Sequence, residues 1–284
     1  MMFNTRSHFK WRWMAAAVLG LSLSACLNLT IVSNKTGTSV NARLETPSAE
    51  VRQALAPTGV FRVGVYPGSP TSWVKDPKTG ESVGIALDLG KALAKRMNVP
   101  VQVIEFDRVA LVLDALKDGN VDFTFTNATA ARAKDMDFTP PMVRLELGYL
   151  VVGASPLKSV TEMDQAGMRI GVSQGSSSQG VLTQLYKQAT VVPADSLAKA
   201  QTMLNAKQID AFATNKGILF EMSDALPGSR VINGRWGLEN LAIAIPKGRE
   251  VGRLFVQNFA NEMAQNGELD KAIQRSGLRG TVRD

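Results

Sequence analysis

The stretch TFTNATAARAKDMDF, Thr124 to Phe138, joins the end of a buried strand to an isolated arginine. Apolar and polar residues alternate from Val121 to Phe125, a pattern typical of a strand. Asn127 and Thr129 then place amide and hydroxyl groups just before Arg132. A guanidinium binds a carboxylate through two parallel hydrogen bonds, and short polar side chains at a strand end can complete the site. The stretch predicts a site for a small anion; the alternative is a surface arginine on the first turn of a helix.

Composition limits the classes of function. The chain has 284 residues, 45% of them apolar, which is enough for one or two globular domains. Its formal charge is +7, and removal of an N-terminal segment that carries Arg6, Lys10 and Arg12 leaves 7 − 3 = +4. This charge is mild, and the basic residues form no patch interleaved with aromatic side chains. We therefore expect no binding of nucleic acid.

The chain has one histidine, His8, and one cysteine, Cys26. His8 lies in the removable segment, so the mature protein lacks histidine for a metal site or a catalytic triad. We expect no metal site and no cofactor, and a single cysteine excludes an intrachain disulfide.

Residues 1–25 are typical of an export signal. A basic start precedes an apolar run from Met14 to Leu23 that is shorter than the roughly twenty residues a membrane-spanning helix needs. Small residues then lead to Cys26 in the sequence LSAC, which resembles the lipobox of bacterial lipoprotein precursors. The resemblance implies a lipid on Cys26 and a globular part outside the cytoplasmic membrane. Ordinary cleavage nearby and an uncleaved anchor are the alternatives.

Residues 26–58 read as a tether followed by a short helix. The first part is polar and aperiodic, whereas Thr46 and Pro47 can start a helix that ends before Pro57 and Gly59. The folded domain is expected to begin here.

Strand and helix patterns alternate through the rest of the chain. The expected strands and helices, in order, are 60–66, 86–97, 101–106, 109–117 and 121–125, and then 168–172, 173–187, 190–192, 197–205, 209–213 and 217–222. Such alternation predicts βαβ units with parallel sheets, whose ligands bind at the carboxyl ends of strands. Long apolar strands at 145–152 and 241–245 separate the two sets and predict two lobes joined by a pair of strands. A final helix at 251–265 and the segment 268–276 are expected to return to the first lobe.

The order of these landmarks resembles the family 3 bacterial extracellular solute-binding proteins, the amino-acid receptors of ABC importers. The matching pieces are FRVGV at 61–65, VGIALDLGKALAKRM at 83–97, LKDGNVDF at 116–123, TAARAKDMDFTPP at 129–141, RIGVSQGSSS at 169–178 and QIDAFATN at 208–215. The resemblance implies an α/β, two-lobed periplasmic-binding-protein fold of type II, each lobe a mainly parallel sheet flanked by helices. It places 59–148 and 241–284 in lobe 1 and 149–240 in lobe 2.

The resemblance also implies a binding site. Arg132 matches the arginine that holds the α-carboxylate of the ligand, and Thr129 matches the hydroxyl residue three positions earlier. Ser176 and Ser177 match a loop whose hydroxyl and N–H groups bind the other side of that carboxylate. Asn127 belongs to the same site. Two aromatic residues of the first βα loop, Tyr66 and Trp73, are candidates to stack on the ligand, and Trp73 is preferred.

Two departures from the family concern the ligand. Thr214-Asn215 stands where the family places an aspartate that pairs with the α-ammonium group, and the loop before Arg132 is about two residues short. A neutral amide accepts a hydrogen bond but does not neutralise an ammonium, so Asn215→Asp is expected to improve the binding of α-amino acids. The ligand is an amino acid, a modified amino acid or a carboxylate that lacks the amine. Glu146, within the first long strand, can supply the missing charge; the alternative is a solvent-facing or structurally paired glutamate.

We expect an extracytoplasmic receptor that closes like a clamshell around its ligand, acts as a monomer and delivers the ligand to an ABC permease in the membrane. One alternative is a dehydratase-like enzyme of the same fold, for which Glu146 is the only general acid that the sequence offers, without a partner. The other alternative is a sensing module that serves a separate protein. We expect no enzymatic activity.

Overall fold

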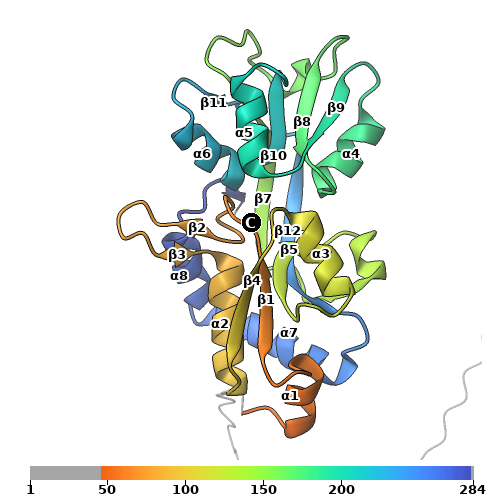
Figure 1. Ribbon diagram of the computed structural model, residues 1–284, viewed down its shortest axis with the longest axis vertical. Coiled ribbons are helices and arrows are strands. Elements are labelled where there is room, and N and C mark those ends of the chain that lie inside the picture. Colours follow the sequence, from red (N-terminus) through yellow and green to blue (C-terminus); the bar gives the residue numbers. More distant parts are fainter. Residues whose placement is uncertain (1–45, 283–284) are drawn as a thin grey trace, which may run out of the picture. The chain divides into compact units, whose positions relative to one another are not determined.

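The computed structural model describes residues 46–282 and is shown in Figure 1. The expected signal segment 1–25, Cys26 and most of the expected tether lie outside the described residues. Within 46–282, no helix combines the length and the apolar character that crossing a membrane requires. The first described element is α1, Ala49–Leu55. Ser48 caps its N-terminus, since the Ser48 hydroxyl accepts a hydrogen bond from the Val51 N–H.

The first βαβ set surrounds strand β1. Its elements are β1 (Phe61–Val65), α2 (Ile85–Met97), β4 (Val101–Glu105), α3 (Val109–Lys117) and β5 (Thr124–Asn127), with a small hairpin of β2 (Val74–Lys75) and β3 (Ser82–Val83) before α2. β1 is parallel to β4, and Val63 forms a parallel bridge to Phe123, immediately before β5. α2 buries Leu89, Leu93 and Met97 because residues four apart lie on the same helix face.

The second βαβ set surrounds strand β8. Its elements are β8 (Arg169–Ser173), α4 (Ser177–Leu185), β9 (Thr190–Ala194), α5 (Leu197–Asn205) and β10 (Ala211–Asn215), preceded by a 3₁₀ turn η2 (Val160–Glu162) and followed by α6 (Lys216–Ala225) and β11 (Arg230–Val231). β8 is parallel to both β9 and β10. α5 packs against β8, β9 and β10, and α4 lies beside β9 (Figure 1). The two sets therefore repeat one arrangement.

Two long antiparallel strands connect the sets. They are β7 (Val143–Val151) and β12 (Gly237–Pro246), and β12 also pairs with β5 while β7 pairs with β10. The resulting strand order is β5-β12-β7-β10-β8-β9, with β6 (Met136–Phe138) beside β12 and β11 and β13 (Thr281–Val282) beside β7. The carboxyl ends of β5 and β10 thus approach the middle of the sheet, where β7 and β12 meet.

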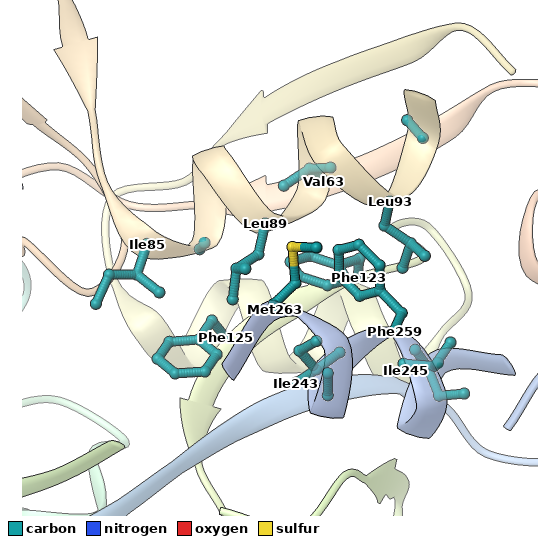
Figure 2. Packing of buried hydrophobic residues seen from close by; sticks show 14 of the residues in the cluster. Val63, Ile85, Leu89, Leu93, Phe123, Phe125, Ile243, Ile245, Phe259 and Met263 are labelled. Atoms are coloured by element: carbon teal, nitrogen blue, oxygen red, sulfur yellow. The ribbon is translucent and has the colours of Figure 1, made fainter. Parts of the chain in front are cut away.

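The largest buried cluster lies between α2, β12 and the final helices α7 (Glu250–Gln265) and α8 (Glu268–Arg275). Figure 2 shows Leu89 and Leu93 of α2 facing Phe259 and Met263 of α7, with Ile243 of β12 in the same cluster. Full burial of such a side chain contributes about 1.5–3 kcal/mol. Further buried clusters draw on residues between Tyr149 and Ile232. The C-terminal helices therefore pack on the first βαβ set although 120 or so residues separate them in sequence.

The predicted alternation of strands and helices is confirmed, and three boundaries are corrected. The strand expected at 121–125 is β5, Thr124–Asn127, because its backbone pairs with β12 only from Thr124 onward. Arg132 begins a 3₁₀ turn, η1 (Arg132–Lys134), and not a longer helix. The second crossing strand begins at Gly237 and not at 241, since its first half pairs with β7. That extension brings Glu239 into the sheet.

Candidate functional site

A small cavity of ≈ 30 Å³ lies where β5, β10, β12 and the start of α4 meet. Its lining combines a cation, a carboxylate, amides and hydroxyls with a few apolar side chains. The polar lining residues are Tyr66, Thr71, Thr126, Asn127, Arg132, Ser173, Ser176, Ser177, Thr214, Asn215 and Glu239. Most of these residues end a parallel strand or begin a helix, so their side chains and backbone N–H groups converge on one point.

Arg132 is held by one side of its guanidinium. Nη1 donates to the Thr126 hydroxyl and to the Asn127 carbonyl, both at 3.0 Å, and the Arg132 backbone N–H donates to the Thr129 hydroxyl at 3.2 Å. Within 46–282, Nε and Nη2 of Arg132 have no hydrogen-bond partner. Burial lowers the pKa of Arg132, yet a guanidinium stays protonated in proteins. The unpaired side of the fork matches the two oxygens of a carboxylate.

The N-terminus of α4 faces the same cavity. The hydroxyl of Ser176 accepts a hydrogen bond from the Gln179 N–H and caps the helix. Gly175 precedes it with φ +71°, and a Cβ there would lie 2.5 Å from the Cβ of Ala110 in α3. The loop of the second set therefore lies against the first set without room for a side chain. Helix N-termini stabilise anions through free N–H groups and the helix dipole.

A chain of hydrogen bonds crosses the cavity. Asn127 donates through Nδ2 to the Ser177 hydroxyl at 3.2 Å, and that hydroxyl donates to Glu239 Oε1 at 3.2 Å. Asn215 donates through Nδ2 to Glu239 Oε2 at 3.0 Å. Asn127 belongs to β5 of the first set, whereas Ser177 and Asn215 belong to the second. The chain thus links both sets to one carboxylate on β12.

Glu239 is the charged residue of the cavity that the sequence did not reveal. Its side chain is 7% exposed, and within the described residues no ion pair joins it to a cation. Burial raises its pKa, while the charge of Arg132 and the hydrogen bonds from Asn215 and Ser177 act in the opposite direction. A glutamate next to an asparagine at the start of the apolar run GLENLAIAIP is the signal that could have found it.

The structure brings together six of the eight predicted ligand-binding residues. Those that line the cavity are Tyr66, Asn127, Arg132, Ser176, Ser177 and Asn215. Thr129 lies behind Arg132, where it supports the backbone of η1. Trp73 lies apart, in a separate pocket of ≈ 520 Å³ that also contains Asp107 and Glu221, and it packs partly on the main core. Ligand contact by each of these residues stays a prediction.

Glu146 does not face the cavity. One of its oxygens accepts a hydrogen bond from Lys216 Nζ at 2.5 Å and the other from Arg235 Nη1 at 3.2 Å. Lys216 and then Arg235 hold the pKa of Glu146 below its ordinary value. The alternative of a structurally paired glutamate is therefore the correct one, and Glu146 does not supply the missing charge.

Trp236 has a structural environment as well. It packs against Tyr149, and its indole N–H donates to the Gly148 carbonyl at 3.0 Å.

The cavity offers charge recognition. It holds one cation, Arg132, and one carboxylate, Glu239, on opposite sides of short polar groups. Among residues 46–282, no group of three or more histidine, cysteine, aspartate or glutamate side chains is placed to hold a metal ion. A buried pair of opposite charges matches a ligand that carries both charges itself.

The sequence of the chain is similar to those of known proteins. Residues 61–277 match the family model of the bacterial extracellular solute-binding proteins, family 3. The chain is 26% identical over 245 residues to the glutamine-binding protein of Geobacillus stearothermophilus, which covers 84% of this chain and 93% of that protein.

Solved structures of similar proteins share the fold. An ancestral arginine-binding protein bound to glutamine superposes with a TM-score of 0.68 at 25% identity, covering 76% of this chain and 97% of that one. An ancestral amino-acid-binding protein described as a precursor of cyclohexadienyl dehydratase gives a TM-score of 0.68 at 24% identity, covering 80% and 99%. The expected α/β fold of type II periplasmic binding proteins is confirmed. The chain belongs to the bacterial extracellular solute-binding proteins, family 3, and has the role of a solute-binding receptor.

Proposed function

We propose that the solute is an α-amino acid and that the receptor delivers it to the permease of an ABC importer. Relatives named for binding glutamine and for binding lysine, arginine and ornithine support this ligand class. The carboxylate of the ligand binds Arg132, and the N-terminus of α4 binds its other side. The protein acts as a monomer.

The observation that carries the proposal is the half-occupied guanidinium of Arg132. Thr126 and Asn127 fix Nη1, while Nε and Nη2 have no partner within the described residues. Buried N–H donors without an acceptor cost free energy, so a site that leaves one side of a guanidinium unfilled in this way is built to receive an anion. Ser176 and Ser177 on the opposite side add a helix N-terminus.

Ligand entry requires the two sets to separate. The cavity of ≈ 30 Å³ is far smaller than the roughly 300–1,000 Å³ of ordinary ligand sites. Asn127 and Ser177 must release one another for an amino acid to enter, since their hydrogen bond crosses between the sets. The lobes of this motion are 59–148 with 241–284, and 149–240, and β7 with β12 forms the hinge. The separate buried clusters support this division.

We also propose that the mature protein lies in the periplasm or on the extracytoplasmic face of the membrane, anchored by a lipid on Cys26 after removal of residues 1–25. The family of extracellular solute-binding proteins supports the compartment. The lipobox-like LSAC sequence supports the anchor.

We propose that the protein binds its ligand without converting it. The named curated relatives are binding proteins, and one structural neighbour is a binding protein described as an enzyme precursor. Acid–base chemistry needs an acid and a base that act together, whereas Glu239 accepts hydrogen bonds from the neutral donors Asn215 and Ser177, and the Tyr66 hydroxyl donates to Ser69.

Removal of Arg132 tests the function. We expect Arg132→Ala to weaken the binding of the preferred amino acid by about 100-fold or more, because truncation of one partner of a buried charged pair costs about 2–5 kcal/mol. Isothermal titration calorimetry of the purified protein against the twenty standard amino acids provides the measurement. Arg235→Ala is the matched control, since Arg235 is half-exposed and pairs with Glu146 outside the cavity. Equal affinities of Arg132→Ala and the control contradict the proposal.

A further inference from the structure

We propose that Glu239 binds the α-ammonium group of the ligand and thereby restricts the receptor to zwitterionic α-amino acids. This inference rests on the proposed function and adds the residue that sets the ligand class. The negative charge that pairs with the ammonium then comes from Glu239 on β12, because the end of β10 carries the neutral Asn215 in place of an aspartate.

The geometry of Glu239 leaves room for a further donor. Each of its oxygens accepts one hydrogen bond, from Ser177 at 3.2 Å and from Asn215 at 3.0 Å. A carboxylate has about four acceptor positions, so two remain. Glu239 lines the same ≈ 30 Å³ cavity as Arg132. The two side chains form no direct ion pair with each other. A ligand that carries a carboxylate and an ammonium on adjacent atoms can therefore lie between the two.

Asn215 cannot take this role in the conformation that the structure shows. Its Oδ1 accepts the N–H of Ile218 and caps α6, and its Nδ2 donates to Glu239. The amide therefore presents a donor to the cavity, which repels an ammonium. It also explains the asparagine: an aspartate at 215 would place a second carboxylate about 3.0 Å from Glu239, and neighbouring carboxylates resist joint ionisation. The expectation that Asn215→Asp improves binding is thus reversed.

The charges of Arg132 and Glu239 determine how strongly the site prefers an amino acid over a carboxylate without an amine. With a zwitterion bound, Arg132 and Glu239 each gain a counter-charge. A carboxylate that lacks the amine leaves the buried Glu239 unpaired with any cation, and such an unpaired polar group is the strongest source of rejection in binding sites. We expect an amino acid to bind at least about 100-fold more tightly than the same acid with hydrogen in place of the α-amino group.

Calorimetry of the wild type, Glu239→Gln and Asn215→Asp tests the assignment with the twenty amino acids and their analogues without the α-amino group. Glu146→Gln is the matched control, because Glu146 lies on the neighbouring strand and pairs with Lys216 and Arg235 instead. We expect the Glu239→Gln variant to bind the amino acid about 30-fold or more weakly than the wild type does. The ratio of its affinities for the amino acid and for the analogue without the α-amino group should also be smaller than in the wild type. Asn215→Asp gives no gain, and the control keeps the wild-type affinity.

The outcomes separate the two claims. A wild type that binds no amino acid of the panel overturns the proposed function. A wild type that binds an amino acid, but with a Glu239→Gln variant of equal affinity and equal preference, overturns only the role of Glu239. Tight binding of the analogue by the wild type, or a gain of affinity in Asn215→Asp, also overturns that role. The wild-type comparison needs no variant, so it holds even if Glu239→Gln does not fold.

Proton release gives a second readout in the wild type. In the ligand-free cavity, burial is the main cause that raises the pKa of Glu239 above its ordinary value of 4.5. A bound ammonium group lowers this pKa, because it stabilises the carboxylate. The charged groups that face Glu239 stay constant: Arg132 remains protonated, and burial raises the pKa of Tyr66, which remains neutral. Binding therefore releases a proton at pH values between the lower pKa of Glu239 with ligand and its higher pKa without ligand, and affinity rises with pH through this range. Calorimetry in buffers of different ionisation enthalpy measures the release, and its absence contradicts the assignment.

Discussion

The two βαβ sets contain the same arginine–aspartate clasp in different surroundings. In the first set, the N–H and Nε of Arg62 donate to Asp122 Oδ2 at 2.9 and 2.8 Å, and Nη2 bridges Asp122 Oδ1 and the Gly119 carbonyl. In the second set, Arg169 makes the corresponding contacts to Asp210 at 2.8 and 3.1 Å. Arginines at the starts of β1 and β8, the second and the first residue of these strands, thus bind in one way to the aspartates before β5 and β10.

Burial separates the two clasps. Asp122 is 0% exposed and accepts a further hydrogen bond from Arg249 Nη2 at 2.7 Å, whereas Arg169 and Asp210 are 43% and 31% exposed. Arg249 immediately precedes α7 and also donates to the Leu55 carbonyl of α1 at 2.7 Å. The first clasp therefore joins the C-terminal helices to the first set, while the second stays local. Equal geometry does not imply equal stabilisation, because water screens the exposed pair.

The largest expected effect is that of Asp122→Asn. The change removes one charge and leaves the guanidinium groups of Arg62 and Arg249, which are 15% and 11% exposed, without their carboxylate. Breaking a buried ion pair by removing one partner costs about 3–5 kcal/mol. Urea unfolding of wild type and variant at pH 7 measures the free energy of unfolding. A loss below about 1 kcal/mol would mean that the buried clasp behaves like a surface pair.

Removal of Arg249 sharpens the comparison, because the second clasp has no such arginine among the described residues. Arg249→Met keeps the aliphatic packing and leaves Asp122 paired with Arg62, so we expect an intermediate loss of about 1.5–3 kcal/mol, the contribution of a hydrogen bond to a charged group. Amide hydrogen exchange should accelerate in α1 and at the start of α7. Arg253→Met is the control, since among residues 46–282 the ion pair of Arg253 is with Glu250, on the surface of α7. Equal exchange in both variants contradicts the role assigned to Arg249.

Regular local patterns explain why much of the fold was predictable. The helices expected at 109–117 and 197–205 are α3 and α5 with the same bounds, because their apolar spacing and their ends agree. The long crossing strand of the first half was placed within two residues. Arg132 was singled out as an isolated cation after a strand, and Ser176 and Ser177 through the resemblance to the family; all three line the cavity, and their contact with a ligand stays a prediction.

Glu239 was missed because its position depends on strand pairing and not on local pattern. Leu241 pairs with Asn127, and this register places Glu239 beside the cavity, two residues beyond the partner of β5. In sequence, Glu239 and Asn240 interrupt the apolar run and suggest that the strand begins later. Glu146 was considered in its place, although its partners Lys216 and Arg235 lie 70 and 89 residues away along the chain.

A repeated motif was also overlooked. Asp-x-x-x-Thr-Asn occurs at Asp122 to Asn127 and again at Asp210 to Asn215. In each copy the aspartate forms the clasp and the asparagine lines the cavity. The copies are 88 residues apart, and only the fold shows that β5 and β10 are equivalent strands. The repeat indicates that clasp and site are opposite ends of one structural unit.

The smallest expected effect is that of Asp210→Asn, which removes the exposed clasp. Arg169 holds the pKa of Asp210 below its ordinary value of 3.8, so its contribution to stability is complete above that pH and is lost as pH falls through the lower folded-state pKa. Urea unfolding should therefore give a small difference between wild type and variant at pH 7 that shrinks in 1 M salt and vanishes in acid. The difference for Asp122→Asn at pH 7 should be several times larger and should persist in salt. If both substitutions cost the same and respond alike to salt, burial does not decide the strength of these clasps, and the C-terminal helices do not depend on the first one.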